Sequence, residues 1–227
     1  MAMTKAERAL RQEIIDQCRW MNTSGLNQGT SGNLSARYKD AMLITPSGQP
    51  YDDMKVGDIA AMSIDGNDEE AWQGPLAPSS EWRFHRDILR TRPDVNAVVH
   101  THSTYATALA IARKPIPACH YMIAAAGGNT VPCARYATFG SAALSANVLA
   151  ALKGRTGCLI ENHGLIATGD SVKKAMWLAV EIETLAKQYY LTLAIGGPVL
   201  LDDKEIDRVT KKFKSYGLRP ANRRKRS

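Results

Sequence analysis

The sequence lacks the cysteine pairs and the long hydrophobic runs that define several common classes of protein. Its 227 residues include four cysteines, at positions 18, 119, 133 and 158, and no two of them form a C-x-x-C pair. This scatter argues against a cysteine zinc site and against a disulfide framework. Each apolar stretch is broken before it could span a membrane, and the N-terminus has no apolar centre typical of a signal peptide. We therefore expect a cytoplasmic protein with reduced thiols and no membrane partner.

The basic residues near the C-terminus have few aromatic residues close to them in the sequence, which argues against nucleic-acid binding. The chain has 29 basic and 22 acidic residues, and part of that excess lies in the last nine positions, at Arg219, Arg223, Arg224, Lys225 and Arg226. A nucleic-acid arm would need aromatic residues or a known binding module beside it, and we find neither. We expect residues 219–227 to be a disordered basic tail, with no nucleic-acid partner. A basic nucleic-acid binder remains a rival hypothesis from a different class.

The apolar residues, 44% of the chain, follow the periods of both helices and strands. No repeat, linker or change of composition divides the chain, so residues 1–218 are predicted to form a single α/β domain with helices around one sheet. Helices are predicted over 4–22, 78–91, 103–112, 140–152, 171–193 and 202–214, and strands over 42–44, 59–64, 95–99, 131–133, 158–160 and 164–167.

The segment Val98-Val99-His100-Thr101-His102 carries the first sign of a metal site. Residues two apart on a strand point to the same face, so His100 and His102 are predicted to lie side by side. Imidazole suits zinc, but two ligands cannot hold an ion, and the best third candidate is His163. Taken alone, the pair could equally be two unrelated polar residues.

Three polar segments could hold an anion. Residues 28–37 and 45–48 combine small polar side chains with glycines, which let backbone N–H groups approach a phosphate, and Ser79 and Ser80 precede a predicted helix. Ordinary turns are the competing explanation.

Three single residues each allow two interpretations. Glu81 could simply interact favourably with the helix dipole, and His85 could be a rival ligand or an interhelical histidine. Tyr121 could be a packing residue or a proton donor.

Several blocks in the same order resemble the class II aldolase/adducin family, and within it the enzymes that act on L-fuculose 1-phosphate. The similarity covers the first predicted helix to about Arg219 and includes Gly25–Asn33, Leu43–Gly48, Pro78–His85, Val98–His102, His120–Asn129, Tyr136–Gly140, Asn162–Ala167 and Phe213–Arg219. The resemblance implies a three-layer α/β/α fold with a mostly antiparallel central sheet. It also implies a homotetramer with active sites at subunit interfaces.

The resemblance further implies one zinc ion per subunit, held by His100, His102 and His163. Glu81 resembles the carboxylate that binds the metal in the empty enzyme and then moves aside as the base. The resemblance implies phosphate binding by Thr30, Asn33, Ser47, Gly48, Ser79 and Ser80. Tyr121 is similar to a tyrosine that reaches a neighbouring subunit and protonates the aldehyde oxygen, while Phe139 and Tyr216 resemble residues that wall the aldehyde side.

The implied reaction is reversible cleavage of L-fuculose 1-phosphate, or a related ketose 1-phosphate, to dihydroxyacetone phosphate and L-lactaldehyde. A Lewis acid stabilises the enediolate in such chemistry, and a base beside it moves the proton. Glu161 and Asn162 depart from the pattern of the fuculose enzymes, which leaves substrate preference open.

Other members of the family keep the alternatives open. The same fold serves methylthioribulose-phosphate dehydratases, sugar-acid phosphate decarboxylases, 4-epimerases and non-catalytic adducin-like binding modules. The epimerases resemble one another in having Asp where this chain has Glu81, so Glu81 argues against that activity. Intact histidines argue against a binding module.

Overall fold

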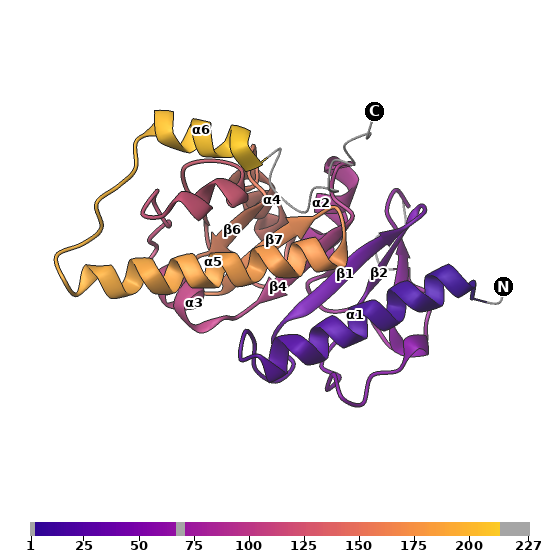
Figure 1. Cartoon of the computed structure of the whole chain (residues 1–227). Coiled ribbons are helices and arrows are strands. Elements are labelled where there is room, and N and C mark those ends of the chain that lie inside the picture. The colour runs from indigo at the N-terminus through magenta and orange to yellow at the C-terminus, as the bar shows by residue number, and fades with distance from the viewer. Residues whose placement is uncertain (1–2, 67–70, 214–227) are drawn as a thin grey trace, which may run out of the picture.

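The computed structural model describes residues 3–66 and 71–213, which form a seven-stranded sheet between two groups of helices (Figure 1). Tyr216 and the predicted tail 219–227 lie outside the described residues. The helices are α1 (Lys5–Thr23), α2 (Trp82–Thr91), α3 (Thr104–Ile111), α4 (Ala142–Ala151), α5 (Val172–Leu193) and α6 (Asp203–Phe213), with short 3-10 helices at Val56–Asp58 and Tyr121–Ala126.

The sheet has the order β3-β2-β1-β4-β7-β6-β5, so strands far apart in the sequence become neighbours. Its strands are β1 (Asn33–Tyr38), β2 (Ala41–Ile44), β3 (Ala60–Ser63), β4 (Ala97–Thr101), β5 (Cys133–Ala134), β6 (Gly157–Ile160) and β7 (Gly164–Gly169). Among the described strands only β5 and β6 pair in parallel. The prediction of a mostly antiparallel sheet is therefore confirmed.

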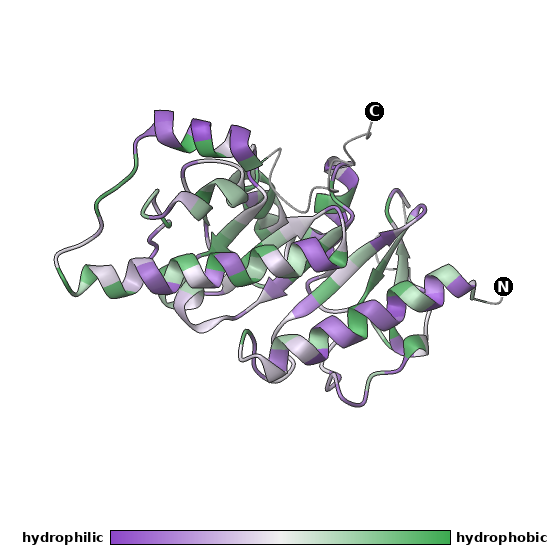
Figure 2. Ribbon diagram, in the orientation of Figure 1, coloured by the Kyte–Doolittle hydropathy of each residue, from purple (hydrophilic) through white to green (hydrophobic). Residues whose placement is uncertain are grey.

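Strand β4 occupies the centre of the sheet and is apolar on both faces. Val99 belongs to the core under α1, α3 and α5, whereas Val98 belongs to the core under α2 and α4. All five residues of β4 are buried. Figure 2 shows the same separation, with apolar strands inside and polar outer surfaces on the helices. Two cores on opposite faces of one sheet make the predicted three layers.

Helix boundaries differ from the prediction in one place that matters for the site. The helix expected from residue 78 begins only at Trp82, because Pro78, Ser79 and Ser80 continue in a non-helical turn and Glu81 takes the N-cap position. Glu81 makes no side-chain capping bond, so its carboxylate is free to point elsewhere. No described helix is long and apolar enough to cross a membrane.

Candidate functional site

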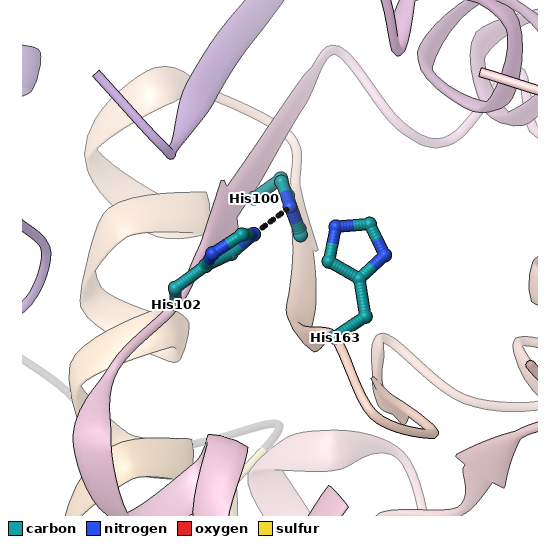
Figure 3. A group of neighbouring side chains, drawn as sticks. All are labelled: His100, His102 and His163. Atoms are coloured by element: carbon teal, nitrogen blue, oxygen red, sulfur yellow. Dashed lines mark hydrogen bonds between the residues drawn. The ribbon is translucent and has the colours of Figure 1, made fainter. Parts of the chain in front are cut away.

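Three histidines meet at one end of the central strands (Figure 3). His100 is the fourth residue of β4, His102 follows the end of that strand, and His163 lies in the turn between β6 and β7. Their ring centroids are 4.8 to 4.9 Å apart in every pair. One nitrogen from each ring lies within 4.8 Å of the others. The predicted convergence of the three imidazoles is therefore present in the structure.

The ring of His100 presents a lone pair to the centre of this group. Its Nδ1 lies 2.9 Å from the carbonyl oxygen of Leu165, which can only accept, so Nδ1 carries the proton. In a neutral ring Nε2 is then unprotonated. This Nε2 lies 3.0 Å from Nε2 of His102 and 3.2 Å from Oε2 of Glu81. A lone pair facing a carboxylate at this distance calls for a cation between them, so the donor set fits a metal ion.

Glu81 is 5% exposed and lies directly against the histidines. Its Oε1 is 3.1 Å from Nε2 of His163, yet this oxygen has no hydrogen-bond partner among the described residues. Burial raises the pKa of the Glu81 carboxyl, but positive charge on the adjacent His100 and His163 rings outweighs burial and holds this pKa well below its usual range. When these rings are neutral, a bound cation would supply that positive charge. An ionised, partly unsatisfied carboxylate beside three imidazoles supports the same conclusion about a cation.

His102 is prepared for metal binding in a different way. Burial, together with His100 and His163 beside it, lowers the pKa of His102 to about 4. Because metals bind the unprotonated ring, His102 is ready to bind over the neutral range.

A second layer of polar side chains supports Glu81 from the β1 side. Asn33 pairs with His100 across β1 and β4, and its Nδ2–H donates to Oε2 of Glu81 at 2.9 Å. The Oδ1 of Asn33 contacts Nε2 of His85, whose Nδ1 contacts the hydroxyl of Ser35. His85 is therefore a buried histidine between α2 and β1 that reaches the site through Asn33, and it does not join the three-histidine group.

Gly164 explains how two of the rings pack so closely against β7. A Cβ at this position would lie 2.5 Å from the carbonyl oxygen of Thr101 and 3.0 Å from Cδ2 of His102. The first of these contacts is with backbone, which cannot move aside cheaply. In the sequence Asn162-His163-Gly164, a candidate metal ligand is thus followed by a glycine that leaves room for the rings of His100 and His102.

The segments predicted to hold a phosphate also come together, although they are distant in the sequence. The N–H of Ser47 donates to the carbonyl oxygen of Ala77, and the N–H of Ser79 donates to that of Thr45. Thr45 in turn accepts the N–H of Leu34 through its hydroxyl. These bonds tie the turn after β2, the turn before α2 and the start of β1 into one unit. Phosphate binding by these segments stays a prediction.

A cavity of about 320 Å³ opens over the histidines, and several predicted residues line it. Ser80, Glu81, His102, His163 and Phe139 are among its walls. Ser31, Tyr136 and Asn162 line the cavity as well. The sequence predicted no role in the site for Ser31 or Tyr136, and it marked Asn162 only as a departure from the family pattern. Ser31 adjoins the predicted phosphate residue Thr30, so its place in a glycine-rich turn was the available signal.

Other predicted site residues are largely exposed or do not line the cavity. Phe139 is 64% exposed and Tyr121 is 50% exposed, and Tyr121 is not among the residues that line the cavity. Asn33 is not among the lining residues either, and its amide is already hydrogen-bonded to Glu81 and His85. To hold a phosphate with this amide, Asn33 would have to release Glu81.

Comparison with known proteins identifies the family. The model of the Class II Aldolase and Adducin N-terminal domain matches residues 12–190. The chain belongs to this family. An L-fuculose phosphate aldolase from Escherichia coli O6:H1 (strain CFT073) is 55% identical over 211 residues, covering 92% of this chain and 96% of the relative. This class II aldolase is therefore an enzyme, a lyase that acts on a carbon–carbon bond.

Two further relatives bear on the substrate and the fold. A 5-methylthioribulose-1-phosphate/5-deoxyribulose-1-phosphate aldolase from Rhodospirillum rubrum is 53% identical over 209 residues, covering 92% of this chain and 93% of the relative. A solved L-fuculose 1-phosphate aldolase structure superposes with a TM-score of 0.87 at 41% identity, covering 91% of this chain and 96% of that one. The relatives agree on aldol chemistry and differ in the sugar phosphate named.

Proposed function

We propose that this chain is a zinc-dependent aldolase that reversibly cleaves L-fuculose 1-phosphate, or a related ketose 1-phosphate, to dihydroxyacetone phosphate and L-lactaldehyde or a related aldehyde. One observation carries the proposal: the Glu81 carboxylate is buried against His100 and His163 at the wall of the cavity. Glu81, two of the histidines, and Ser31 and Ser80 from two of the polar turns line the same cavity. A base, a cation site and an anion site in one place are what retro-aldol cleavage of a phosphorylated sugar requires.

His100, His102 and His163 would hold the zinc ion. When bound, the ion supplies a Lewis acid for the carbonyl of the ketose. The Nε2 of His100, which holds a lone pair in the neutral ring because Nδ1 donates to Leu165, and the unsatisfied Oε1 of Glu81 support a cation at this position. Three neutral imidazoles leave the charge of the ion available to the substrate.

Glu81 would move the proton on carbon. In synthesis it removes a proton beside the carbonyl of dihydroxyacetone phosphate, and that carbon then bonds to the aldehyde carbon. In cleavage the carbon–carbon bond breaks and Glu81 returns a proton to the same carbon. Its low pKa comes from neighbouring histidines, while burial acts in the opposite direction. A carboxylate that moves away from those neighbours while it stays buried therefore becomes the stronger base that this step needs.

Tyr121 would handle the proton on the aldehyde oxygen, giving it in synthesis and taking it in cleavage. Its exposure and its position outside this chain's cavity fit a residue that completes the site of a neighbouring copy. We accordingly include a homotetramer in the proposal. A cytoplasmic location is also included, and the four free cysteines, which suit a reducing compartment, support it.

The phosphate of the substrate would bind at the polar turns, to Thr30, Asn33, Ser47, Gly48, Ser79 and Ser80. The hydrogen bonds between the turn after β2 and the turn before α2 support a shared anion site. A phosphate held there would leave the rest of the sugar to extend toward Phe139. The role of Tyr216 on the aldehyde side, which the family resemblance implies, is part of the same proposal. Fixing the phosphate end orients the reacting carbons.

A second substrate, 5-methylthioribulose 1-phosphate, is favoured by the aromatic walls of the cavity. Tyr136 and Phe139 both line it and are 54% and 64% exposed. Exposed rings offer apolar surface to a methylthio tail, and thioether sulfur packs well on aromatic edges. The bond that would break is the equivalent one in either sugar.

The test is release of dihydroxyacetone phosphate from a panel of ketose 1-phosphates that includes both sugars. We expect cleavage that a chelator abolishes and zinc restores, with kcat/KM deciding between the two substrates. Release from neither sugar, with zinc bound at one per chain, would refute the proposed reaction. Cleavage that survives complete removal of metal would refute the metal dependence.

A further inference from the structure

Four polar side chains form a continuous hydrogen-bonded series that ends on the proposed base. The series runs from Ser35 through His85 and Asn33 to Glu81. All four residues are at most 5% exposed, and Ser35 and His85 are 0% exposed. Buried polar groups that connect in a single series are costly unless each is satisfied, so their arrangement constrains every member.

The chemistry of the last member sets the direction of the whole series. An ionised carboxylate can only accept, so the group of Asn33 that faces Glu81 must be its Nδ2–H. The Oδ1 of Asn33 therefore faces His85, and Nε2 of His85 must carry the proton. In the neutral ring Nδ1 then accepts the hydroxyl proton of Ser35. Each donor thus points toward Glu81, an order in which hydrogen bonds strengthen one another.

His85 cannot easily turn out of this arrangement. Its ring stacks on Phe84, with centroids 4.7 Å apart and an angle of 24° between the planes. Phe84 is itself buried and packs edge-on against His100 at 5.5 Å. The ring is therefore held by packing on its face and by hydrogen bonds at both nitrogens.

We propose that His85 is a positioning residue, which holds the Asn33 amide with its Nδ2–H toward Glu81 and thereby aims the Glu81 carboxylate. This inference rests on the proposed role of Glu81 as the base. Nothing in it requires His85 to touch the substrate. Without the donor on His85, Oδ1 of Asn33 loses its partner, and the amide is held only by its bond to Glu81. The amide can then shift or rotate, and the Glu81 carboxylate is no longer aimed.

Two substitutions of similar size separate this role from a purely structural one. In His85→Gln the side-chain amide reaches the place of Nε2 and can still donate to Asn33. In His85→Asn the shorter amide reaches the place of Nδ1, so it keeps the contact with Ser35 but not the one with Asn33. Both variants replace a buried ring by a smaller amide and lose the stacking on Phe84, so general loss of packing affects them alike.

The experiment measures kcat and KM for the full-length variants with the best ketose 1-phosphate, together with thermal unfolding and crystal structures. We expect His85→Asn to lower kcat by roughly 10- to 100-fold, the range typical of lost second-layer contacts, with KM changed much less. His85→Gln should recover most of that loss at a similar melting temperature. In the crystal structure of His85→Asn the Glu81 carboxylate should have left Nδ2 of Asn33, and in His85→Gln it should remain.

Equal losses of kcat in the two variants would overturn the inference, as would an unmoved carboxylate in His85→Asn. The crystal structures decide the matter even when the wild-type enzyme cleaves none of the sugars tested. A failure of the proposed reaction is therefore seen in the wild-type assay, and a failure of the positioning role is seen in the pair of variants.

Discussion

The two halves of the cavity differ in how completely one chain builds them. In the half that carries the histidines, His100 is 0% exposed, Glu81 and Asn33 are each 5% exposed, and every one of them has a polar neighbour. In the opposite half, Phe139 is 64% exposed and Tyr136 is 54% exposed. The first half is packed at one end of the central strands, whereas the second half consists of aromatic rings on a loop.

This difference offers a physical reason for the relatives' names. Relatives that are 55% and 53% identical to this chain are named for different sugar phosphates, yet all of them are aldolases. A buried half with interlocking hydrogen bonds tolerates little change, since each unsatisfied polar group costs about 1–3 kcal/mol. Exposed rings can vary without that cost. We therefore expect the histidine half to determine the reaction and the aromatic half to determine the aldehyde.

Glu81→Gln should have the largest effect and act only on the histidine half. The amide cannot accept a proton, and general base catalysis is typically worth roughly 10²- to 10⁴-fold, so cleavage should fall by about 10³-fold. The side chain keeps its size, and the three imidazoles remain to bind zinc. Turnover and bound zinc should be measured on the same preparation. Unchanged turnover with zinc still bound would remove Glu81 from its role as the base.

Tyr121→Phe should affect one proton transfer and leave the other almost intact. Loss of the hydroxyl removes the acid for the aldehyde oxygen, and cleavage should fall by roughly 10²-fold, at the lower end of acid–base effects. Exchange of the proton beside the carbonyl of dihydroxyacetone phosphate, followed in D₂O, needs only Glu81 and should change little. Tyr190→Phe, at a similarly exposed tyrosine on α5 that does not line the cavity, is the matched control. Equal damage to cleavage and exchange would contradict the role of Tyr121.

The sequence predicted the histidine half better than the aromatic half, for reasons visible in these residues. The spacing of His100 and His102 follows from strand geometry, so it could be deduced from two positions. His163 could be named only as a candidate, and the metal-binding role of Glu81 required the family resemblance, because the turn before β7 and the start of α2 meet β4 only in the folded chain. Phosphate binding by Asn33 stays a prediction, and the hydrogen bond from its amide to Glu81 was not predicted from the sequence.

The fold was similarly predictable where the pattern was local. Helical periodicity and apolar runs gave most elements to within a few residues, but the helix expected from residue 78 begins at Trp82. The order of the strands and the bonds that join Ser47 and Ser79 to neighbouring turns depend on long-range pairing, which no local pattern encodes. Tyr136 was not predicted to line the cavity, because an exposed ring on a loop leaves no periodic pattern in the sequence.

Gly164→Ala tests whether the packing of the histidine half is as tight as its burial implies. The added Cβ would lie 2.5 Å from the backbone oxygen of Thr101 and 3.3 Å from Cε1 of His100. Such overpacking typically costs about 1–3 kcal/mol, and we expect a lower melting temperature together with weaker zinc binding. Gly57→Ala is the control, because a Cβ there meets nothing within 4 Å. Normal zinc affinity in Gly164→Ala would show that the rings have room to adjust.

Phe139→Ala should have the smallest effect on the reaction and the clearest effect on the choice of sugar. Each buried methylene contributes about 0.8 kcal/mol, so losing the ring surface should reduce kcat/KM for 5-methylthioribulose 1-phosphate by roughly tenfold. L-Fuculose 1-phosphate, which has a hydroxyl near the same end, should lose less because its tail buries less apolar surface. Trp20→Ala, a similarly exposed aromatic on α1 outside the cavity, should change neither value. If Phe139→Ala lowers kcat/KM equally for both sugars, the ring maintains the shape of the site and does not contact the substrate tail. Both halves of the cavity would then determine specificity.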